Sequence, residues 1–405
     1  DVAADIRSNF GPGLGKTLME LCFAQNVVEQ TQGSVLIFTP LAVAEQTVQE
    51  AAKFGIQGVA YRADGDGVLP LITVTNYERR DRFDLSEFAG IVLDESGILK
   101  SHEGKTRAEL TKACADTPYL LCGTATPAPN DWTELGQHAE FLGVMSAKEM
   151  LSMFFVHEGS IRAGAPSNDV SSDGWRLKGH AQDQFWRWVA SWAVLIRHPR
   201  DLGYEDAGYD LPPLTIEQVT VETEWVPQDG ELFAKEASTL QERIRARRTA
   251  LGGRIAKAAE LVAENPDEPW LVWCNLNAEA DALAKAIAGA ANVEGKDSPE
   301  KKIRELLGFV KGKPLHIITK GSIAGRGLNW QHCRQMIYFP SDSFETFFQA
   351  IRRCWRFGQT KPVTVYVMAS SLEGAVVKNL QAKERKYEAM ADAMAAHMID
   401  LTRNA

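Results

Sequence analysis

Residues 11–17 read Gly-Pro-Gly-Leu-Gly-Lys-Thr and contain the residue types that bind nucleotide phosphates. A glycine-rich turn lets backbone N–H groups approach phosphate oxygens. Lys16 would then reach the β- and γ-phosphates, and the Thr17 hydroxyl would bind Mg²⁺. Phe10 stands where the strict Gly-x-x-x-x-Gly-Lys-Thr pattern has glycine. Taken alone, the segment therefore leaves a glycine-rich loop without a ligand as the alternative.

A second segment, Ile-Val-Leu-Asp-Glu at 91–95, places two carboxylates at the end of an apolar run. Asp94 would hold the same Mg²⁺ from a neighbouring strand, and Glu95 would orient or deprotonate a water molecule. The two segments together predict a nucleotide triphosphatase that uses ATP and Mg²⁺.

These side chains need a scaffold of alternating strands and helices. Short apolar runs predict buried parallel strands at 34–39, 71–75, 90–93 and 119–122, with helices over 18–29 and 42–54. A second series predicts strands at 270–274, 315–319, 335–339 and 363–368, with helices over 278–288, 343–354 and 373–398. Strands that alternate with helices predict an α/β fold whose parallel sheets are covered on both faces.

The best linker signal is Leu211-Pro212-Pro213, since proline interrupts regular structure. It divides the chain into a first domain, 1–212, and a second, 213–405. Residues 146–198 break the α/β rhythm and are predicted to form a helical insertion, in which Trp186, Trp188 and Trp192 favour a core role over a functional one. Asp1–Phe10 is barely long enough for the strand that should precede the phosphate loop, so we expect further residues upstream.

Composition limits the classes of protein. A chain of 405 residues that is 45% hydrophobic and 24% charged can bury sizeable cores, and it has no apolar run long enough to span a membrane. Its six cysteines form no Cys-x-x-Cys pair, which predicts buried free thiols, a reducing cytoplasm and no zinc site. The net charge of −9 argues against a generally basic nucleic-acid binder and leaves room for a local basic groove.

Read in order, the motifs resemble those of superfamily-two helicases, and within them the Swi/Snf-like DNA-dependent ATPases. The matching segments are 13–17, 38–40, 73–77, 93–100, 121–127, 325–329 and 349–359. The chain departs from that pattern at Gly97, where members of the family usually have histidine. Its compact size and the stretch 198–203 look most like the small members encoded by phages and prophages, which implies a bacterial or phage-infected cytoplasm.

The resemblance implies two RecA-like domains in tandem, which bind ATP together. By resemblance, the nucleotide is bound by Gly13, Leu14, Gly15, Lys16, Thr17, Leu18, Gly325 and Gln349. Arg353 and Arg356 would stabilise the transferring phosphoryl group in the manner of an arginine finger. They are three residues apart, so a helix would present both on one face, with Arg352 pointing elsewhere as a surface charge. A solvated helix face is the alternative for this pair.

Other positions are implied to contact nucleic acid or to couple it to ATP. The expected phosphate contacts are Thr39, Thr75, Asn76, Asn275, Thr319, Lys320 and Ser322, each of which could also be a plain turn residue. Thr124 and Thr126 couple the ATP site to the nucleic acid by resemblance, although threonines after a strand usually form turns. The densest positive charge is Arg243, Arg245, Arg247, Arg248 and Arg254, either an exposed helix face paired with glutamates or a DNA-binding patch.

The main reading is an ATP-driven motor that translocates on double-stranded DNA without sequence preference. No residue pattern suggests a strand-splitting pin, so translocation or remodelling is favoured over unwinding. A true DNA or RNA helicase is the rival enzyme, and an ATP-gated clamp with little turnover is the rival binding protein. A protein partner, or a segment upstream of Asp1, would direct the motor to its target.

Overall fold

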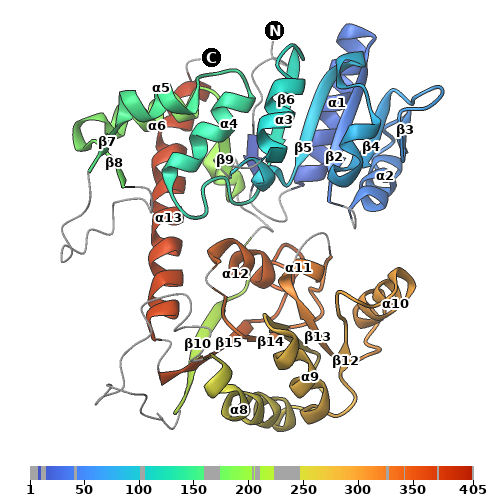
Figure 1. Ribbon diagram of the computed structural model, residues 1–405, viewed down its shortest axis with the longest axis vertical. Helices are drawn as coiled ribbons and strands as arrows, with labels where there is room; N and C mark the ends of the chain where they lie inside the picture. The colour runs from blue at the N-terminus through green and yellow to red at the C-terminus, as the bar shows by residue number, and fades with distance from the viewer. Residues whose placement is uncertain are drawn as a thin grey trace. The chain divides into compact units, whose positions relative to one another are not determined.

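In a computed structural model the chain forms two compact units (Figure 1). Unit 1 comprises Asp1–Tyr209 and Arg385–Ala405, and unit 2 comprises Asp210–Glu384. The structure describes residues 8–10, 15–40, 43–100, 105–158, 174–202, 205, 210–222, 247–324, 328–341, 343–371 and 374–403. The first break between units falls three residues before the predicted boundary at Pro212.

Unit 1 is built on a parallel sheet of five strands, in the order β3-β4-β2-β5-β6. The strands are β3 (Val59–Tyr61), β4 (Ile72–Asn76), β2 (Ser34–Thr39), β5 (Phe88–Asp94) and β6 (Tyr119–Gly123). β2 has the bounds predicted for it. Because all five strands run the same way, their carboxyl ends meet at one edge of the sheet.

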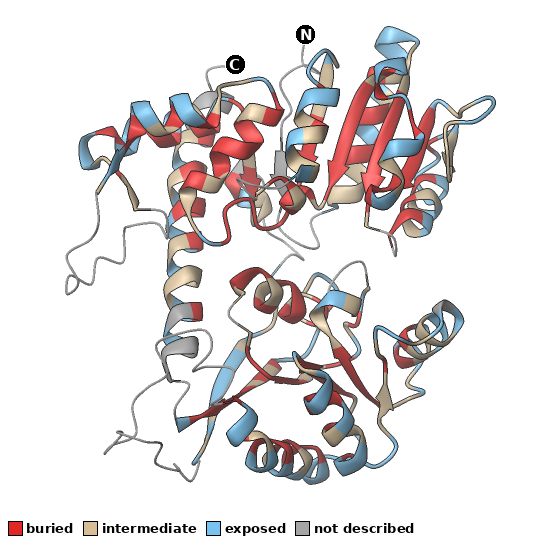
Figure 2. Ribbon diagram, viewed as in Figure 1, coloured by how far each residue is buried: buried red, intermediate tan, exposed pale blue. Residues whose placement is uncertain are grey.

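Helices α1 (Lys16–Thr31) and α2 (Ala44–Lys53) pack on one face of this sheet, where Leu21, Val27 and Ile37 belong to one buried cluster. The alternate side chains of β2, Leu36 and Phe38, are also fully buried. Successive strand residues point to opposite faces, so both faces are covered (Figure 2). Further helices of unit 1 are α3 (Lys105–Ala113), α4 (Leu135–Phe141) and short 3-10 turns at Tyr77–Arg82, Leu85–Glu87, Ser96–Leu99, Trp132–Glu134, Gly179–Ala181 and Pro199–Leu202.

The predicted helical insertion is only partly helical. It contains α5 (Ala147–Phe154) and α6 (Gln182–Ala190), but also an antiparallel pair, β7 (Phe155–His157) with β8 (Trp175–Leu177). β9 (Val194–Ile196) then pairs in parallel with β1 (Ser8–Phe10). Trp186 and Trp192 are buried and Trp188 is half-buried against Phe154, which confirms the core interpretation for these tryptophans.

The terminal helix corrects the predicted second domain. α13 (Gly374–Arg403) was assigned to that domain, yet the chain from Arg385 onward groups with unit 1. Arg197 forms an ion pair with Asp392 at 2.8 Å, and the Leu195 N–H lies 3.3 Å from the Met398 sulfur. Tyr387, Met390 and Met394 are buried. Apolar residues at helical spacing thus bury one face of α13 in unit 1.

Unit 2 is a parallel sheet of six strands, in the order β10-β15-β14-β11-β13-β12. The strands are β10 (Leu214–Val221), β15 (Val363–Ser370), β14 (Gln335–Tyr338), β11 (Trp270–Cys274), β13 (His316–Lys320) and β12 (Ala291–Asn292). The helices are α8 (Leu251–Glu264), α9 (Asn277–Ala286), α10 (Pro299–Val310), α11 (Gly321–Ala324) and α12 (Phe344–Ile351).

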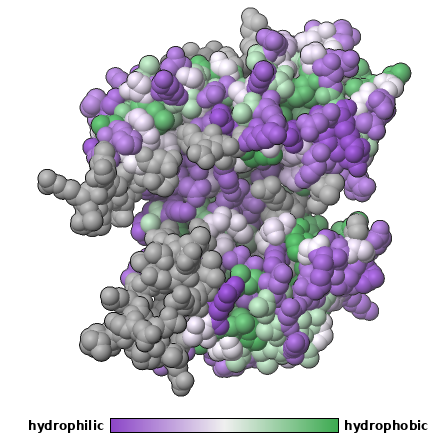
Figure 3. Space-filling view, in the orientation of Figure 1, coloured by the Kyte–Doolittle hydropathy of each residue, from purple (hydrophilic) through white to green (hydrophobic). Residues whose placement is uncertain are grey.

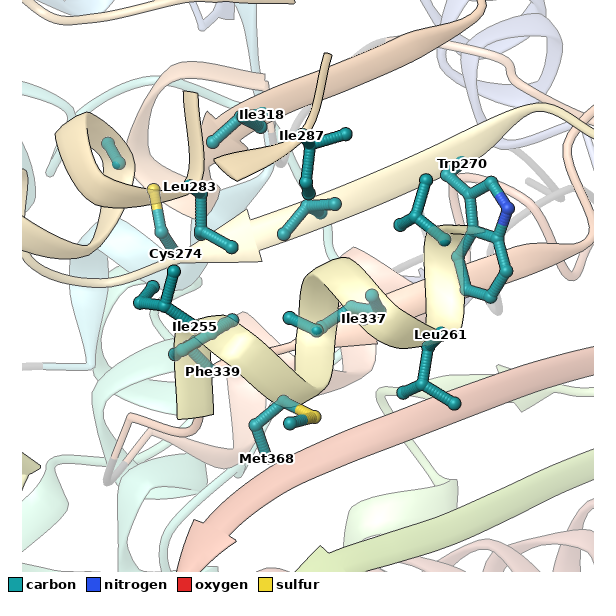
Figure 4. Packing of buried hydrophobic residues seen from close by; sticks show 14 residues of the cluster. Ile255, Leu261, Trp270, Cys274, Leu283, Ile287, Ile318, Ile337, Phe339 and Met368 are labelled. Atoms are coloured by element: carbon teal, nitrogen blue, oxygen red, sulfur yellow. The ribbon is translucent and has the colours of Figure 1, made fainter. Parts of the chain in front are cut away.

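The core of unit 2 fills both faces of its sheet. Trp270 and Cys274 point from β11 into a cluster with α8 and α9 (Figure 4), and Val272 belongs to the same cluster. The alternate residue Trp273 is buried on the opposite face, with its ring 5.9 Å from Trp330. The two units therefore confirm the predicted α/β class, with two parallel-sheet domains of RecA-like type in tandem.

The surface and the cysteines add two findings. On the face seen in Figure 3, hydrophilic side chains cover much of the coloured surface. Across the described residues, no helix combines the length and the apolar character needed to cross a bilayer. All six cysteines are free thiols, and only Cys22 is exposed, as the scattered pattern predicted.

Candidate nucleotide site

The first turn of α1 and the end of β5 form the centre of the site. Gly15 precedes α1 with φ of 81°, a left-handed conformation that glycine adopts without a steric penalty. Lys16 extends from the first helical turn, and its Nζ lies 2.6 Å from Asp94 Oδ1 and 2.7 Å from Glu95 Oε1. The sequence-predicted residues Lys16, Asp94 and Glu95, separated by almost 80 positions, thus share one cluster.

Glu95 adopts an uncommon backbone conformation. Its φ of 54° and ψ of 52° lie in the left-handed region, which is unfavourable for a residue with a Cβ. Contacts on either side hold this turn in place. The Tyr77 hydroxyl donates to the Asp94 carbonyl at 2.7 Å, and Ser96 Oγ lies 3.2 Å from His138 Nε2. These two contacts therefore fix the backbone around Glu95, the predicted base.

At this cluster, burial and the neighbouring charges shift the pKa values in opposite directions. Burial disfavours the charge of Lys16, but the carboxylates of Asp94, Glu95 and Glu20 hold its pKa above the usual range. Burial also raises the pKa of Asp94, and Lys16 opposes that shift. The Lys16 side chain is only 14% exposed, so its charge is weakly screened by solvent. Nucleotide phosphates would therefore compete with carboxylates for this ammonium group.

Sequence reasoning missed two residues of the site. His138, on α4, is 1% exposed, and burial lowers its pKa to about 4. No histidine stands at position 97, and an imidazole reaches Ser96 from a different element instead. Glu20 is also 1% exposed, and burial and Asp94 raise its pKa. Its spacing of four residues from Lys16 was the only sequence signal, since residues i and i+4 share a helix face.

The donor set is suited to Mg²⁺. Asp94, Glu95 and the half-buried Thr17 supply hard oxygen atoms, and Glu20 Oε1 is a buried oxygen without a hydrogen-bond partner among the described residues. No group of three or more metal-binding side chains forms a ready-made cage within the described part of the chain. Mg²⁺ is commonly held by one or two carboxylates together with substrate phosphates and water, so this arrangement meets its requirements.

The rest of the predicted nucleotide set is only partly visible. Gly13, Leu14 and Gly325 lie outside the described residues. Leu18 lies on the first turn of α1 and is half-buried. In unit 2, Gln349 is buried, and its side-chain amide lies 3.5 Å from Glu345 on the preceding turn of α12.

The helix-face argument for the two arginines is wrong. α12 ends at Ile351, so Arg353 and Arg356 follow in turns and do not share a helix. The Arg353 side chain is buried and donates to the carbonyls of Gln349 at 3.1 Å and Leu328 at 3.2 Å. Arg356 is half-buried. Arg352 is more than a surface charge, because its guanidinium lies over the Phe348 and Trp355 rings at 5.1 and 4.4 Å.

The nucleic-acid candidates of unit 1 point into the fold. Thr39 and Thr75 are fully buried, and their hydroxyls donate to the carbonyls of Thr75 at 3.4 Å and Arg62 at 2.9 Å. Asn76 is also buried, 3.4 Å from the Tyr61 hydroxyl. The hydroxyl contacts expected for the two threonines do not match this arrangement because the hydroxyls face inward, whereas phosphate contact through backbone N–H groups stays a prediction.

In unit 2 the candidates divide. Thr319 is buried, and its hydroxyl donates to the Val293 carbonyl at 3.4 Å, so it has the same inward role. Asn275 and Ser322 are exposed, and Lys320 is half-buried with its Nζ 2.5 Å from Asn277. These three lie at the carboxyl ends of β11 and β13, where they are available to a ligand.

The predicted coupling threonines lie directly after β6. Thr124 and Thr126 are buried, and Thr124 Oγ1 accepts the Thr126 N–H at 3.2 Å, which is a turn-forming role. Between them, the Ala125 carbonyl accepts the Tyr387 hydroxyl of α13 at 3.3 Å. The sequence had not linked the terminal helix to this motif.

The basic run is not a single exposed surface. Arg243 and Arg245 lie outside the described residues, and Arg248 is exposed. Arg247 and Arg254 are buried, and Arg254 pairs with the buried Glu279 at 3.3 Å. For Arg247 and Arg254, both predicted alternatives are therefore wrong, because neither side chain faces solvent.

Comparisons with known proteins agree with the fold. No protein-family model matches the chain, and no curated protein matches its sequence. Among solved structures, "S. cerevisiae Dbp5 bound to RNA and ADP BeF3" is similar with a TM-score of 0.59 at 12% identity, over 98% of this chain and 89% of that chain. At this identity the likeness shows the fold alone, in agreement with two parallel-sheet domains of RecA-like type in tandem.

Proposed function

We propose that this protein is an ATP-hydrolysing motor that translocates on double-stranded DNA, of the Swi/Snf-like type encoded by phages and prophages. One observation carries the proposal: Lys16 Nζ lies within 2.7 Å of both Asp94 and Glu95 at the carboxyl edge of a parallel sheet. A phosphate-loop lysine beside paired carboxylates is the equipment of nucleotide hydrolysis.

The residues divide the chemistry among themselves. Lys16 binds the β- and γ-phosphates, and Thr17 with Asp94 would hold Mg²⁺, which when bound neutralises phosphate charge. Glu95 accepts the proton of a water whose oxygen attacks the γ-phosphorus while the bond to the β–γ bridging oxygen breaks. Arg356, with Arg353, supplies positive charge to the transferring phosphoryl group.

Support for nucleic-acid binding comes from unit 2. Asn275, Lys320 and Ser322 offer polar and charged groups at its sheet edge, and such contacts grip phosphates without reading bases. Because the net charge of the chain is −9, binding depends on this local surface and on a directing partner.

The test is the ATPase rate without polymer and with duplex DNA, single-stranded DNA or RNA. Stimulation by duplex DNA above the other polymers is expected, and equal or greater stimulation by RNA would overturn the choice of DNA.

A strand-separating helicase is the second candidate. It is favoured by the structural neighbour, whose description names bound RNA. A strand-displacement assay separates the two enzymes. Slow turnover that no polymer stimulates would instead indicate an ATP-gated clamp.

A further inference from the structure

Glu20 is a third carboxyl group in the nucleotide site that the proposed mechanism does not use. It lies on α1 four residues after Lys16 and three after Thr17, so all three side chains occupy one side of the helix. Among the neighbouring carboxyl groups, Asp94 has the largest effect on the pKa of Glu20. A helix of apolar character would normally place an aliphatic residue here, because Leu21, Ala24 and Val27 around it are fully buried.

Two further observations favour a role toward a ligand for this position. First, Glu20 is 1% exposed, yet its Oε1 has no hydrogen-bond partner among the residues that the structure describes. A buried carboxyl oxygen is costly unless something binds it. The charged groups that act on it within unit 1 are the nucleotide-site residues Lys16, Asp94 and Glu95.

Second, the neighbouring strand leaves space for this carboxyl. Gly123 ends β6 directly opposite Asp94 on β5. A Cβ at position 123 would overlap Glu20 Oε1 and would approach Lys16 Cδ to 3.4 Å. The absence of a side chain at Gly123 therefore holds open the space that Glu20 occupies beside Asp94.

We propose that Glu20 is a positioning residue of the divalent-cation site, which strengthens metal binding by orienting Asp94 and a metal-bound water. This inference rests on the proposed function and adds a residue to the same site. It does not require Glu20 to bind the metal directly, in keeping with the lack of a three-ligand cage among the described residues. Carboxyl groups in such outer positions commonly change metal affinity by 10–100-fold.

The experiment measures metal binding itself. Mn²⁺ is titrated into the full chain with saturating ADP, and free Mn²⁺ is followed by electron paramagnetic resonance. We expect Glu20→Gln to weaken Mn²⁺ binding about tenfold. The matched control is Glu29→Gln, because Glu29 is an exposed glutamate on the same helix and undergoes the same substitution. It should bind Mn²⁺ as the parent does.

A second measurement separates metal positioning from general damage to the fold. ADP binding in EDTA should be as tight for Glu20→Gln as for the parent, since only the metal contribution is lost. Parent-like Mn²⁺ affinity in Glu20→Gln would overturn the inference, and so would an equal loss of ADP binding with and without metal.

Gly123→Ala provides an independent variant if Glu20→Gln does not fold. It retains every carboxyl group but places a methyl group in the space of Glu20, so Mn²⁺ binding should weaken, and parent-like affinity would refute the inference. Failure of the parent chain to bind ADP and Mn²⁺ at all would instead refute the proposed function.

Discussion

Replacement of His138 by glutamine should remove a pH dependence from the stability of unit 1. His138 is 1% exposed on α4, beside Ser96; Lys100 acts on it through its charge, and Glu134 through a backbone hydrogen bond. Burial, with a smaller contribution from Lys100, lowers the pKa of His138 to about 4. Glutamine can still donate a hydrogen bond to Ser96 Oγ but does not titrate.

The magnitude follows from the difference between folded and unfolded pKa values. An unfolded histidine has a pKa of about 6.5, so between pH 6.5 and 4 the unfolded chain binds the extra proton. Stability from the neutral imidazole is therefore fully present above pH 6.5 and is lost as the pH falls towards 4. Between pH 8 and pH 5 the loss is about 2 kcal/mol.

Hydrogen exchange of the β5 amides measures the free energy of opening of unit 1. Measured from pH 5 to 8 and corrected for the intrinsic exchange rate, it should decline towards acid more steeply in the parent than in His138→Gln. The difference in opening free energy between the parent and His138→Gln should change by about 2 kcal/mol between pH 8 and pH 5. His180→Gln, which replaces an exposed histidine of the same unit, serves as the control and should follow the parent.

The test depends only on how the difference in opening free energy between the parent and His138→Gln changes with pH. A destabilisation of His138→Gln that is the same at every pH therefore does not affect the conclusion. Parallel curves for the parent and His138→Gln would show that the imidazole titrates alike in both states. They would refute the claim that burial keeps it neutral beside the Asp94–Glu95 turn.

Four further outcomes follow from the site. Lys16→Ala should abolish ATP turnover by weakening nucleotide binding, and calorimetry with unchanged ATP affinity would contradict the phosphate-loop assignment. Glu95→Gln should bind ATP but not hydrolyse it, because the amide cannot accept a proton; loss of ATP affinity as severe as that of Lys16→Ala would make Glu95 a structural residue. Arg356→Ala should lower kcat by about 10³ with little change in ATP affinity. Arg352→Ala should leave kcat nearly unchanged, and the loss of its ring contacts should lower the stability by about 1 kcal/mol. Equal effects of the two substitutions on kcat would refute the catalytic role of Arg356. Lys320→Ala should reduce the log–log salt slope of DNA binding by about one, and a flat salt dependence in the parent would exclude phosphate-driven binding.

The phosphate-binding and carboxylate residues could be predicted because each set is contiguous in the sequence. A glycine turn must directly precede Lys16, and the carboxylates must directly follow a strand, so short local patterns located both. The buried strands Ser34–Thr39 and Trp270–Cys274 were also predicted with their observed bounds, because short continuous apolar runs are typical of buried strands.

Elements with weaker patterns were missed. β10 (Leu214–Val221) carries polar side chains along an edge of its sheet, and β3 and β12 have three and two residues. Such strands form because a neighbouring strand offers unpaired backbone groups, which a local pattern does not reveal.

The extent of α12 shows the same limit at a functional motif. Phe347, Ile351 and Cys354 keep helical spacing, in line with the helix predicted to end at Cys354. The chain turns instead after Ile351, where the Arg353 carbonyl accepts the Trp330 N–H at 2.8 Å and Gln359 donates to the Cys354 carbonyl. Hydrogen bonds from other segments replaced the helical ones.

The sequence by itself thus determined the fold class, the Lys16–Asp94–Glu95 cluster and the free thiols. Only the tertiary structure placed His138 against Ser96, Glu20 beside Asp94 and the end of α13 on unit 1. Buried polar side chains of this site take their roles from partners 42 and 262 positions away in the sequence. Local residue patterns carry no information about such partners, because they are chosen by packing and by the need to satisfy buried polar groups.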